Sequence, residues 1–249
     1  MQTKTLYKKD IYNGSLVLVN HNYPIHQDYC SSMINVHENV SYQVEQKVHK
    51  LFWQCMNHLQ IKDEIVITSA YRSAQDQEKL YNHSLKENGK DYTQKYVAKS
   101  HHSEHETGLA IDLALRTNHI DMICPDFPYT GICQKFRELC YDYGFVERYG
   151  EFKQSITHIS QEPWHFRYVG FPHSLIMKDK NLCLEEYHDF LKQYTPYHPY
   201  TYVVNQRVFD IYYVPVKQST TIALRSDAVY QISGNNMDGA IVTVWRNCL

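Results

Sequence analysis

The sequence has few of the features that mark several common classes of protein. In its 249 residues no apolar run approaches the length of a membrane-spanning helix. The opening residues Met1 to Thr5 lack the charged and then apolar pattern of a signal peptide. No internal repeat, low-complexity tract or glycine-rich phosphate-binding loop is visible. We therefore expect a soluble, cytoplasmic protein with no transmembrane segment.

Charge and cysteine usage narrow the possible classes further. The formal net charge of −2 provides no electrostatic basis for binding nucleic acid or anionic lipid. The seven cysteines are an odd number and include no Cys-x-x-Cys pair, which indicates reduced thiols rather than a disulfide framework. Cys55 and Cys140 occupy helical positions among apolar residues, so we expect both in the core. A hydrophobic content of 43% is ample for such a core.

The hydrophobic pattern predicts an α+β fold, with a small antiparallel sheet flanked by helices. Alternating or continuous apolar runs predict strands, and apolar residues at helical spacing predict helices. Ser41 and Ser73 are expected to cap two helices, while Gly89 and Gly144 end two. The expected strands are 16–20, 65–69, 109–115 and 164–169, the expected helices are 41–60, 73–88 and 132–143, and the expected loops are 89–102 and 116–131.

The character of the chain changes beyond residue 194. Residues 194–200 contain two prolines and are predicted to be a linker. The segments that follow are β-rich, at 202–216, 220–224, 229–233 and 240–245, with a hairpin turn at 234–239. We therefore expect a main domain, 1–194, and a small β-rich extension, 195–249. The extension has no cluster of ligand-type residues, and the sequence does not decide whether it covers an edge of the cleft, supports a homodimer or contacts a larger substrate.

Two separate stretches, 103–112 and 162–166, contain the side chains with the most chemistry. They supply two imidazoles and a carboxylate that can hold a metal, at His105, Asp112 and His165. A second carboxylate, Glu162, can transfer protons. A catalytic zinc site needs this set, with three ligands, an open position and a base. Alone, the spacing of His105 and Asp112 is weak evidence, because an ordinary surface histidine would satisfy it.

Local context favours a metal over a surface position. Asp112 lies between Ala110 and Ala114 on one face of an apolar strand, and a buried carboxylate is costly unless it is paired or bound to a metal. His101 and His102 are rival ligands, although adjacent residues of an extended chain cannot both face one ion.

Arg72 stands between a buried strand and a helix, where a side chain can point into a cleft. Its guanidinium can bind a substrate carboxylate through two parallel hydrogen bonds, or stabilise charge that develops on a carbonyl oxygen. A structural ion pair is an equally simple interpretation. Gln77 and Ser103 are weaker candidates for contact with the substrate.

Three motifs together resemble one family. They are Ser-x-His-x-x-Gly-x-Ala-x-Asp at 103–112, Glu-x-x-His at 162–165 and Tyr71-Arg72-Ser73. In this order they resemble the zinc D,D-peptidases of the VanX and VanY type, over roughly residues 10–192. The length of the chain and its lack of an export segment are most similar to the VanXY enzymes of glycopeptide resistance, which combine D,D-dipeptidase and D,D-carboxypeptidase activities.

The resemblance implies a function and a role for each residue. His105, Asp112 and His165 would bind Zn²⁺, Glu162 would act as the base, and Arg72 would orient and polarise the scissile carbonyl. The implied substrates are D-Ala-D-Ala and the D-Ala-terminated peptides of peptidoglycan precursors, whose removal would deprive vancomycin of its target. Two alternatives remain open: a zinc L,D-endopeptidase of the same fold, and a catalytically silent module that binds cell-wall peptides.

Overall fold

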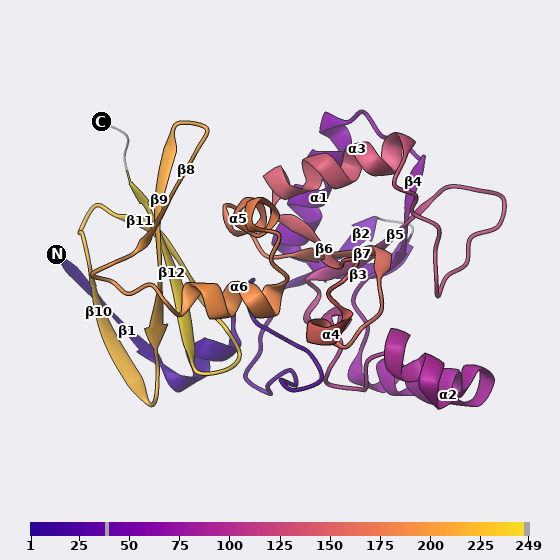
Figure 1. Ribbon diagram of the computed structural model, residues 1–249, viewed down its shortest axis with the longest axis horizontal. Coiled ribbons are helices and arrows are strands. Elements are labelled where there is room, and N and C mark those ends of the chain that lie inside the picture. Colours follow the sequence, from indigo (N-terminus) through magenta and orange to yellow (C-terminus); the bar gives the residue numbers. More distant parts are fainter. Residues whose placement is uncertain (38–39, 247–249) are drawn as a thin grey trace. The chain divides into compact units, whose positions relative to one another are not determined.

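The computed structural model describes residues 1–37 and 40–246, and these divide into two compact units (Figure 1). The central unit comprises residues 19–25 and 30–183. The terminal unit comprises residues 1–18, 26–29 and 184–249, with the exception of the undescribed residues at its end. Each unit has its own sheets, and each is described below by itself.

A four-stranded antiparallel sheet organises the central unit. Its strands lie in the order β4-β5-β7-β6. Their bounds are β4 Ile65–Ser69, β5 Ala110–Leu115, β6 Phe145–Tyr149 and β7 Glu162–Tyr168. A separate hairpin pairs β2 (Met33–His37) with β3 (Val40–Glu45). The α+β class predicted from the sequence is confirmed, and the sheet places β5 and β7 side by side at its centre.

Helices flank this sheet and close its core. They are α1 Gln46–His58, α2 Ala74–Tyr96, α3 Gly131–Leu139, α4 Gln154–Thr157 and α5 His173–Lys180, with 3-10 helices η2 Glu104–Thr107 and η3 Cys140–Tyr143. The rings of Phe136 and Phe166 pack edge to face at 5.1 Å and are fully buried. Cys55 and Cys140 are also fully buried, as predicted. The six described cysteines are free thiols, and Cys248 lies outside the described residues.

Two predicted elements near the beginning of the chain are wrong. The helix predicted at 41–60 begins only at Gln46, because Val40–Glu45 pairs with β2 as a strand. The helix is capped by Glu45, whose carboxylate accepts the backbone N–H of Lys47 at 2.7 Å, and not by Ser41. Residues 16–20 form no strand: their apolar side chains are buried, and the Leu18 N–H donates to the Asn235 carbonyl at 3.2 Å as a loop contact. The apolar run therefore correctly indicated burial at 16–20, but the strand predicted from it is wrong.

Helix α2 begins as predicted but continues further. The Ser73 hydroxyl accepts the backbone N–H of Asp76 at 3.1 Å, which confirms the cap. Gly89, with φ of 78°, interrupts the helical conformation, yet the helix resumes and reaches Tyr96. The hydroxyls of Ser84 and Thr93 lie 2.8 Å apart across this kink. The first part of the predicted loop 89–102 is therefore helical.

The terminal unit is β-rich, in agreement with the sequence pattern. Its sheet has the order β11-β12-β9-β8, and β1 pairs with β10 in a second, two-stranded sheet. The bounds are β1 Gln2–Tyr7, β8 Tyr200–Val204, β9 Arg207–Pro215, β10 Ser219–Leu224, β11 Val229–Gly234 and β12 Gly239–Arg246, with η1 Lys8–Tyr12 and α6 Leu184–Leu191. In Figure 1 the indigo first strand runs beside the yellow β10.

The predicted turn at 234–239 is confirmed. The side-chain oxygen of Asn235 accepts the backbone N–H groups of Met237, Asp238 and Gly239 at 2.9–3.0 Å, which closes the hairpin. The β-rich run at 202–216 is divided by Asn205 and Gln206, both with positive φ. Within the described residues, no helix is both long enough and apolar enough to cross a bilayer.

Candidate active site

Strands β5 and β7 bring two predicted ligands face to face. Asp112 on β5 stands directly opposite His165 on β7. The third predicted ligand, His105, lies in η2, immediately before β5. Gly108 ends η2 with a φ of 72° and lets the chain turn into the strand. The sheet register therefore produces the juxtaposition that residue spacing alone could not guarantee.

The three side chains converge on one point. Nε2 of His105 lies 3.1 Å from one oxygen of Asp112, and Nδ1 of His165 lies 3.0 Å from the other. The potential ligand atoms of the three residues all lie within 4.8 Å of one another. Nδ1 of His105 lies 2.7 Å from the Ala70 carbonyl, which can only accept, so Nδ1 carries the proton and Nε2 is left to bind an ion.

This donor set fits a metal ion. Ligand atoms at about 2.0–2.2 Å from a tetrahedral zinc are roughly 3.3–3.6 Å apart, close to the distances between these side chains. All three residues are buried, and the contact of Asp112 Oδ1 with His165 Nδ1 at 3.0 Å does not have the geometry of a hydrogen bond. A bound cation would satisfy that oxygen. The rivals lie elsewhere: His102 contacts the Asn20 carbonyl at 2.7 Å, and the ring of His101 is exposed beside Glu106.

Burial and neighbouring charges shift the pKa values of the three predicted ligands in opposite directions. Burial raises the pKa of Asp112, but the two neighbouring imidazoles outweigh that effect and hold it well below its usual range. Burial likewise lowers the pKa of His165, whereas the carboxylates of Asp112 and Glu104 reverse the shift and raise it to about 10. For His105, burial prevails and its pKa is lowered. A divalent cation would take the place of the proton that His165 otherwise holds.

Glu162 is next to the ligands without being one of them. Its carboxylate lies 3.6 Å from Nδ1 of His165 and is buried. Burial, together with the negative charges of Asp112 and Glu104, raises its pKa to about 8. A carboxyl group with a pKa near neutrality can both accept and return a proton, as a general base must.

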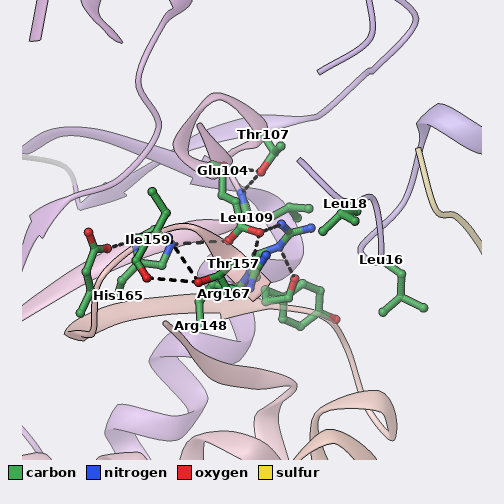
Figure 2. A network of polar contacts seen from close by, with 12 residues as sticks. Leu16, Leu18, Glu104, Thr107, Leu109, Arg148, Thr157, Ile159, His165 and Arg167 are labelled. Carbon is green, nitrogen blue, oxygen red and sulfur yellow. Dashed lines mark hydrogen bonds and ion pairs between the residues drawn. The ribbon is translucent and has the colours of Figure 1, made fainter. Parts of the chain in front are cut away.

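Sequence reasoning missed a buried carboxylate behind the site. Oε1 of Glu104 accepts from Arg148 Nε at 2.9 Å and lies 2.7 Å from Arg167 Nη1, while Oε2 lies 3.5 Å from Nε2 of His165 (Figure 2). Glu104 and both arginines are almost inaccessible to solvent. The two arginines hold the pKa of Glu104 well below its usual range, although burial opposes them. The carboxylate thus faces the nitrogen of His165 that is turned away from Asp112.

Arg72 is held in place by two residues that flank it in sequence. Its Nη1 donates to Gln77 Oε1 at 2.8 Å and its Nη2 to the Ser69 hydroxyl at 2.7 Å. Burial lowers the pKa of Arg72, and nearby carboxylates oppose that shift. Gln77 is itself buried and donates to the Ala98 carbonyl. Gln77 therefore contacts Arg72 in addition to being available to a substrate.

A cavity of about 100 Å³ unites the predicted residues. It is lined by all seven of them, namely Arg72, Gln77, Ser103, His105, Asp112, Glu162 and His165. Tyr149 and Trp164 also line it, as do Met122 and Ile123 from the predicted loop 116–131. The sequence offered no specific signal for Tyr149, whose ring lies 4.9 Å from that of His165.

Comparison with known proteins identifies the class. The VanY family model, described as D-alanyl-D-alanine carboxypeptidase, matches residues 37–171. The bifunctional D-Ala-D-Ala dipeptidase and D-Ala-D-Ala carboxypeptidase VanXYC of Enterococcus gallinarum is 38% identical over 183 residues, which cover 72% of this chain and 96% of that protein. Fold and site together define a D,D-peptidase, and the chain belongs to the VanY family.

Two solved structures refine this placement. The vancomycin-resistance D,D-dipeptidase VanXYg, in complex with a D-Ala-D-Ala phosphinate analogue, matches with a TM-score of 0.96 and 46% identity over 98% of this chain and 99% of that chain. A mutant of the D,D-pentapeptidase VanY in complex with Zn(II) matches with a TM-score of 0.60 and 28% identity over 70% of this chain and 98% of that chain. The resemblance and the enzyme class predicted from the motifs are confirmed.

Proposed function

We propose that this chain is a zinc-dependent D,D-peptidase that cleaves D-Ala-D-Ala and removes the C-terminal D-alanine of peptidoglycan precursor pentapeptides. The observation that carries the proposal is the convergence of His105, Asp112 and His165 in one cavity, with Glu162 beside them. The VanXYg and VanXYC relatives, with their D-Ala-D-Ala substrates, support the same substrate class.

The residues of the site divide the chemistry between them. His105, Asp112 and His165 would hold the zinc ion, which would supply Lewis acidity to polarise a carbonyl and lower the pKa of water. Glu162 accepts the proton of the attacking water and returns it to the departing amine of D-alanine. Arg72, fixed by Ser69 and Gln77, stabilises the negative charge that develops on the carbonyl oxygen. Because the site is small and buried, water outside the reaction is excluded.

In a cell, this activity would remove the D-Ala-D-Ala target of vancomycin while precursors with another terminus persist. We propose the cytoplasm as its location, in keeping with the free thiols of the described cysteines. The assignment of residues 1–194 to catalysis, the separate role of residues 195–249 and a homodimer stay predictions.

Zinc analysis combined with D-alanine release from both substrates tests the proposal. Wild-type protein should contain zinc and release D-alanine from the dipeptide and the pentapeptide, whereas His105→Ala should lose both properties. His83→Ala, an exposed change on α2, is the matched control and should retain both. Activity confined to L,D-linked muropeptides would favour the L,D-endopeptidase instead. Peptide binding without any turnover by the zinc-loaded protein would favour the silent binding module.

A further inference from the structure

A second cavity, of about 470 Å³, adjoins the catalytic cavity within the central unit. Val97, Ala98, Tyr149 and Ile159 line both cavities, so the layer formed by these four residues borders the two. Tyr149 in this layer also contacts the ring of His165. A substrate chain that extends from the catalytic cavity past these residues would therefore reach the second cavity.

Hydrogen bonds connect the residues that line both cavities to the catalytic site. Gln77, which holds Arg72, donates to the Ala98 carbonyl at 2.7 Å. The backbone N–H of Ser160 donates to the Lys95 carbonyl at 2.9 Å, which joins the end of α2 to the segment that precedes β7. These hydrogen bonds fix the segments around Ala98 and Ser160, which border the second cavity, relative to the proposed catalytic residues.

The two cavities differ in charge. The catalytic cavity is lined by the carboxylates of Glu104, Asp112 and Glu162. The described residues that line the second cavity include no aspartate or glutamate, but they include one lysine and three histidines: His21, Lys99, His102 and His158. Such a lining attracts an anion, because positive charge and N–H donors surround the space without an internal counter-ion.

Two side chains of this lining are within reach of a ligand. Lys99 and His158 are exposed, and the ring of His158 meets that of His21 edge to face at 3.9 Å. His158 adopts a left-handed conformation, with φ of 60°, where it ends α4. Lys99, in the segment that follows α2, and His158, at the end of α4, thus come from two different parts of the chain and line one cavity.

We propose that this second cavity binds the upstream part of a peptide substrate, through a carboxylate on a residue before the scissile bond. The inference rests on the proposed function and specifies that the pentapeptide substrate carries a carboxylate upstream of the scissile bond. The dipeptide D-Ala-D-Ala ends at the scissile bond and uses the catalytic cavity alone. A precursor pentapeptide extends further, and its γ-linked glutamate carries a free carboxylate that Lys99 and the imidazoles can bind.

Three substrates test the proposal with the zinc-loaded protein. They are D-Ala-D-Ala, the pentapeptide with the free glutamate carboxylate, and the same pentapeptide with that carboxylate amidated. The wild-type KM should be lower for the acidic pentapeptide than for its amide. Lys99→Glu should raise the KM for the acidic pentapeptide roughly fivefold to tenfold, with little change for the amide or the dipeptide. His158→Asn, which tolerates the left-handed conformation, should act in the same direction.

Lys86→Glu on the exposed face of α2 introduces the same charge change away from this cavity and is the matched control. Equal KM values for the acidic and amidated pentapeptides in the wild type would overturn the inference, as would an equal effect of Lys99→Glu on all three substrates. Calorimetric binding of both pentapeptides to Glu162→Ala measures the charge preference without turnover. Absence of hydrolysis would thus overturn the proposed function, while equal affinities in this assay would overturn the upstream site.

Discussion

His165 stands opposite Asp112 in the antiparallel register of β7 and β5, and the two side chains approach to 3.0 Å between Nδ1 and Oδ1. His105 Nε2 lies 3.1 Å from Asp112, and the carboxylates of Glu104 and Glu162 lie 3.5 and 3.6 Å from the ring nitrogens of His165. Substitution of His165, which removes Nδ1, should therefore abolish metal binding. Substitutions of the neighbouring residues should affect metal binding and catalysis separately. The predictions below exploit that separation.

Glu162→Ala should abolish turnover while metal still binds. We expect kcat to fall roughly 10²- to 10⁴-fold, because no other group replaces the proton transfer. The zinc content measured by atomic spectroscopy should remain that of the wild type, since Glu162 is not a ligand. Retained activity would assign the base to another residue, and lost zinc would assign Glu162 to the metal.

Glu104→Gln should weaken metal binding without touching any ligand. The variant removes the charge that faces Nε2 of His165, and such changes typically cost about 10- to 100-fold in metal affinity. It also removes the buried carboxylate that pairs with two buried arginines, so the free energy of unfolding should fall by about 3–5 kcal/mol. Chelator competition and urea unfolding measure the two effects, with exposed Glu87→Gln as the control. Unchanged zinc affinity would limit Glu104 to a structural role.

The stability of the metal-free protein should depend on pH through Glu162. Its pKa is raised to about 8 in the folded protein, so the folded state binds more protons than the unfolded state from about pH 4.5 to about 8. This contribution to stability therefore declines as pH rises through that window, at up to about 1.4 kcal/mol per pH unit. In urea unfolding with chelator present, the free energy of unfolding of Glu162→Gln should rise relative to that of the wild type as pH increases through this window. A constant difference would contradict the raised pKa.

Arg72→Lys should preserve charge but lose catalysis. Lysine cannot donate to Ser69 and Gln77 while presenting a planar pair of N–H groups to the substrate. We expect kcat to fall roughly 100-fold or more. Steady-state kinetics on D-Ala-D-Ala measure this, with exposed Arg116→Lys as the comparison. If only KM changed, Arg72 would bind the substrate without acting on the carbonyl oxygen.

Gly108→Ala should destabilise the protein by straining the backbone turn between η2 and β5. Its φ of 72° disfavours a side chain, and an added Cβ would lie 2.5 Å from the end of Met33. We expect a loss of about 1–3 kcal/mol in the free energy of unfolding. Gly150→Ala, which meets no atom within 4 Å, is the matched control in the same denaturation assay. Equal stability of the two variants would show that the turn tolerates a Cβ.

Much of the site was predictable because its residues lie in short local patterns. The apolar alternation around Asp112 and the aromatic and β-branched run at 164–169 predict strands without any knowledge of their partners, and β7 extends that run back to Glu162. Glu104 could not be identified in this way, since its significance depends on Arg148, which lies 44 residues further along the chain. The same limit applies to residues 16–20, where an apolar run is buried without forming a ladder.

Helix boundaries show a related limit. Val44 fits the apolar period of α1 as well as it fits a strand, and only the pairing of β3 with β2 decides between them. Gly89 was expected to end α2, but the hydroxyl contact between Ser84 and Thr93 supports the helix beyond it. In both places a contact outside the local pattern determined the outcome.

The pairing of β1 with β10 has a consequence for the order of assembly. Thr5 and Thr221 touch across this ladder although 216 residues separate them in the chain. On the ribosome, the first strand must therefore wait, unpaired, until almost the entire polypeptide has been synthesised. The segment between, which carries all three proposed metal ligands, can meanwhile collapse around its own sheet, so the proposed catalytic residues need not await closure of the ends.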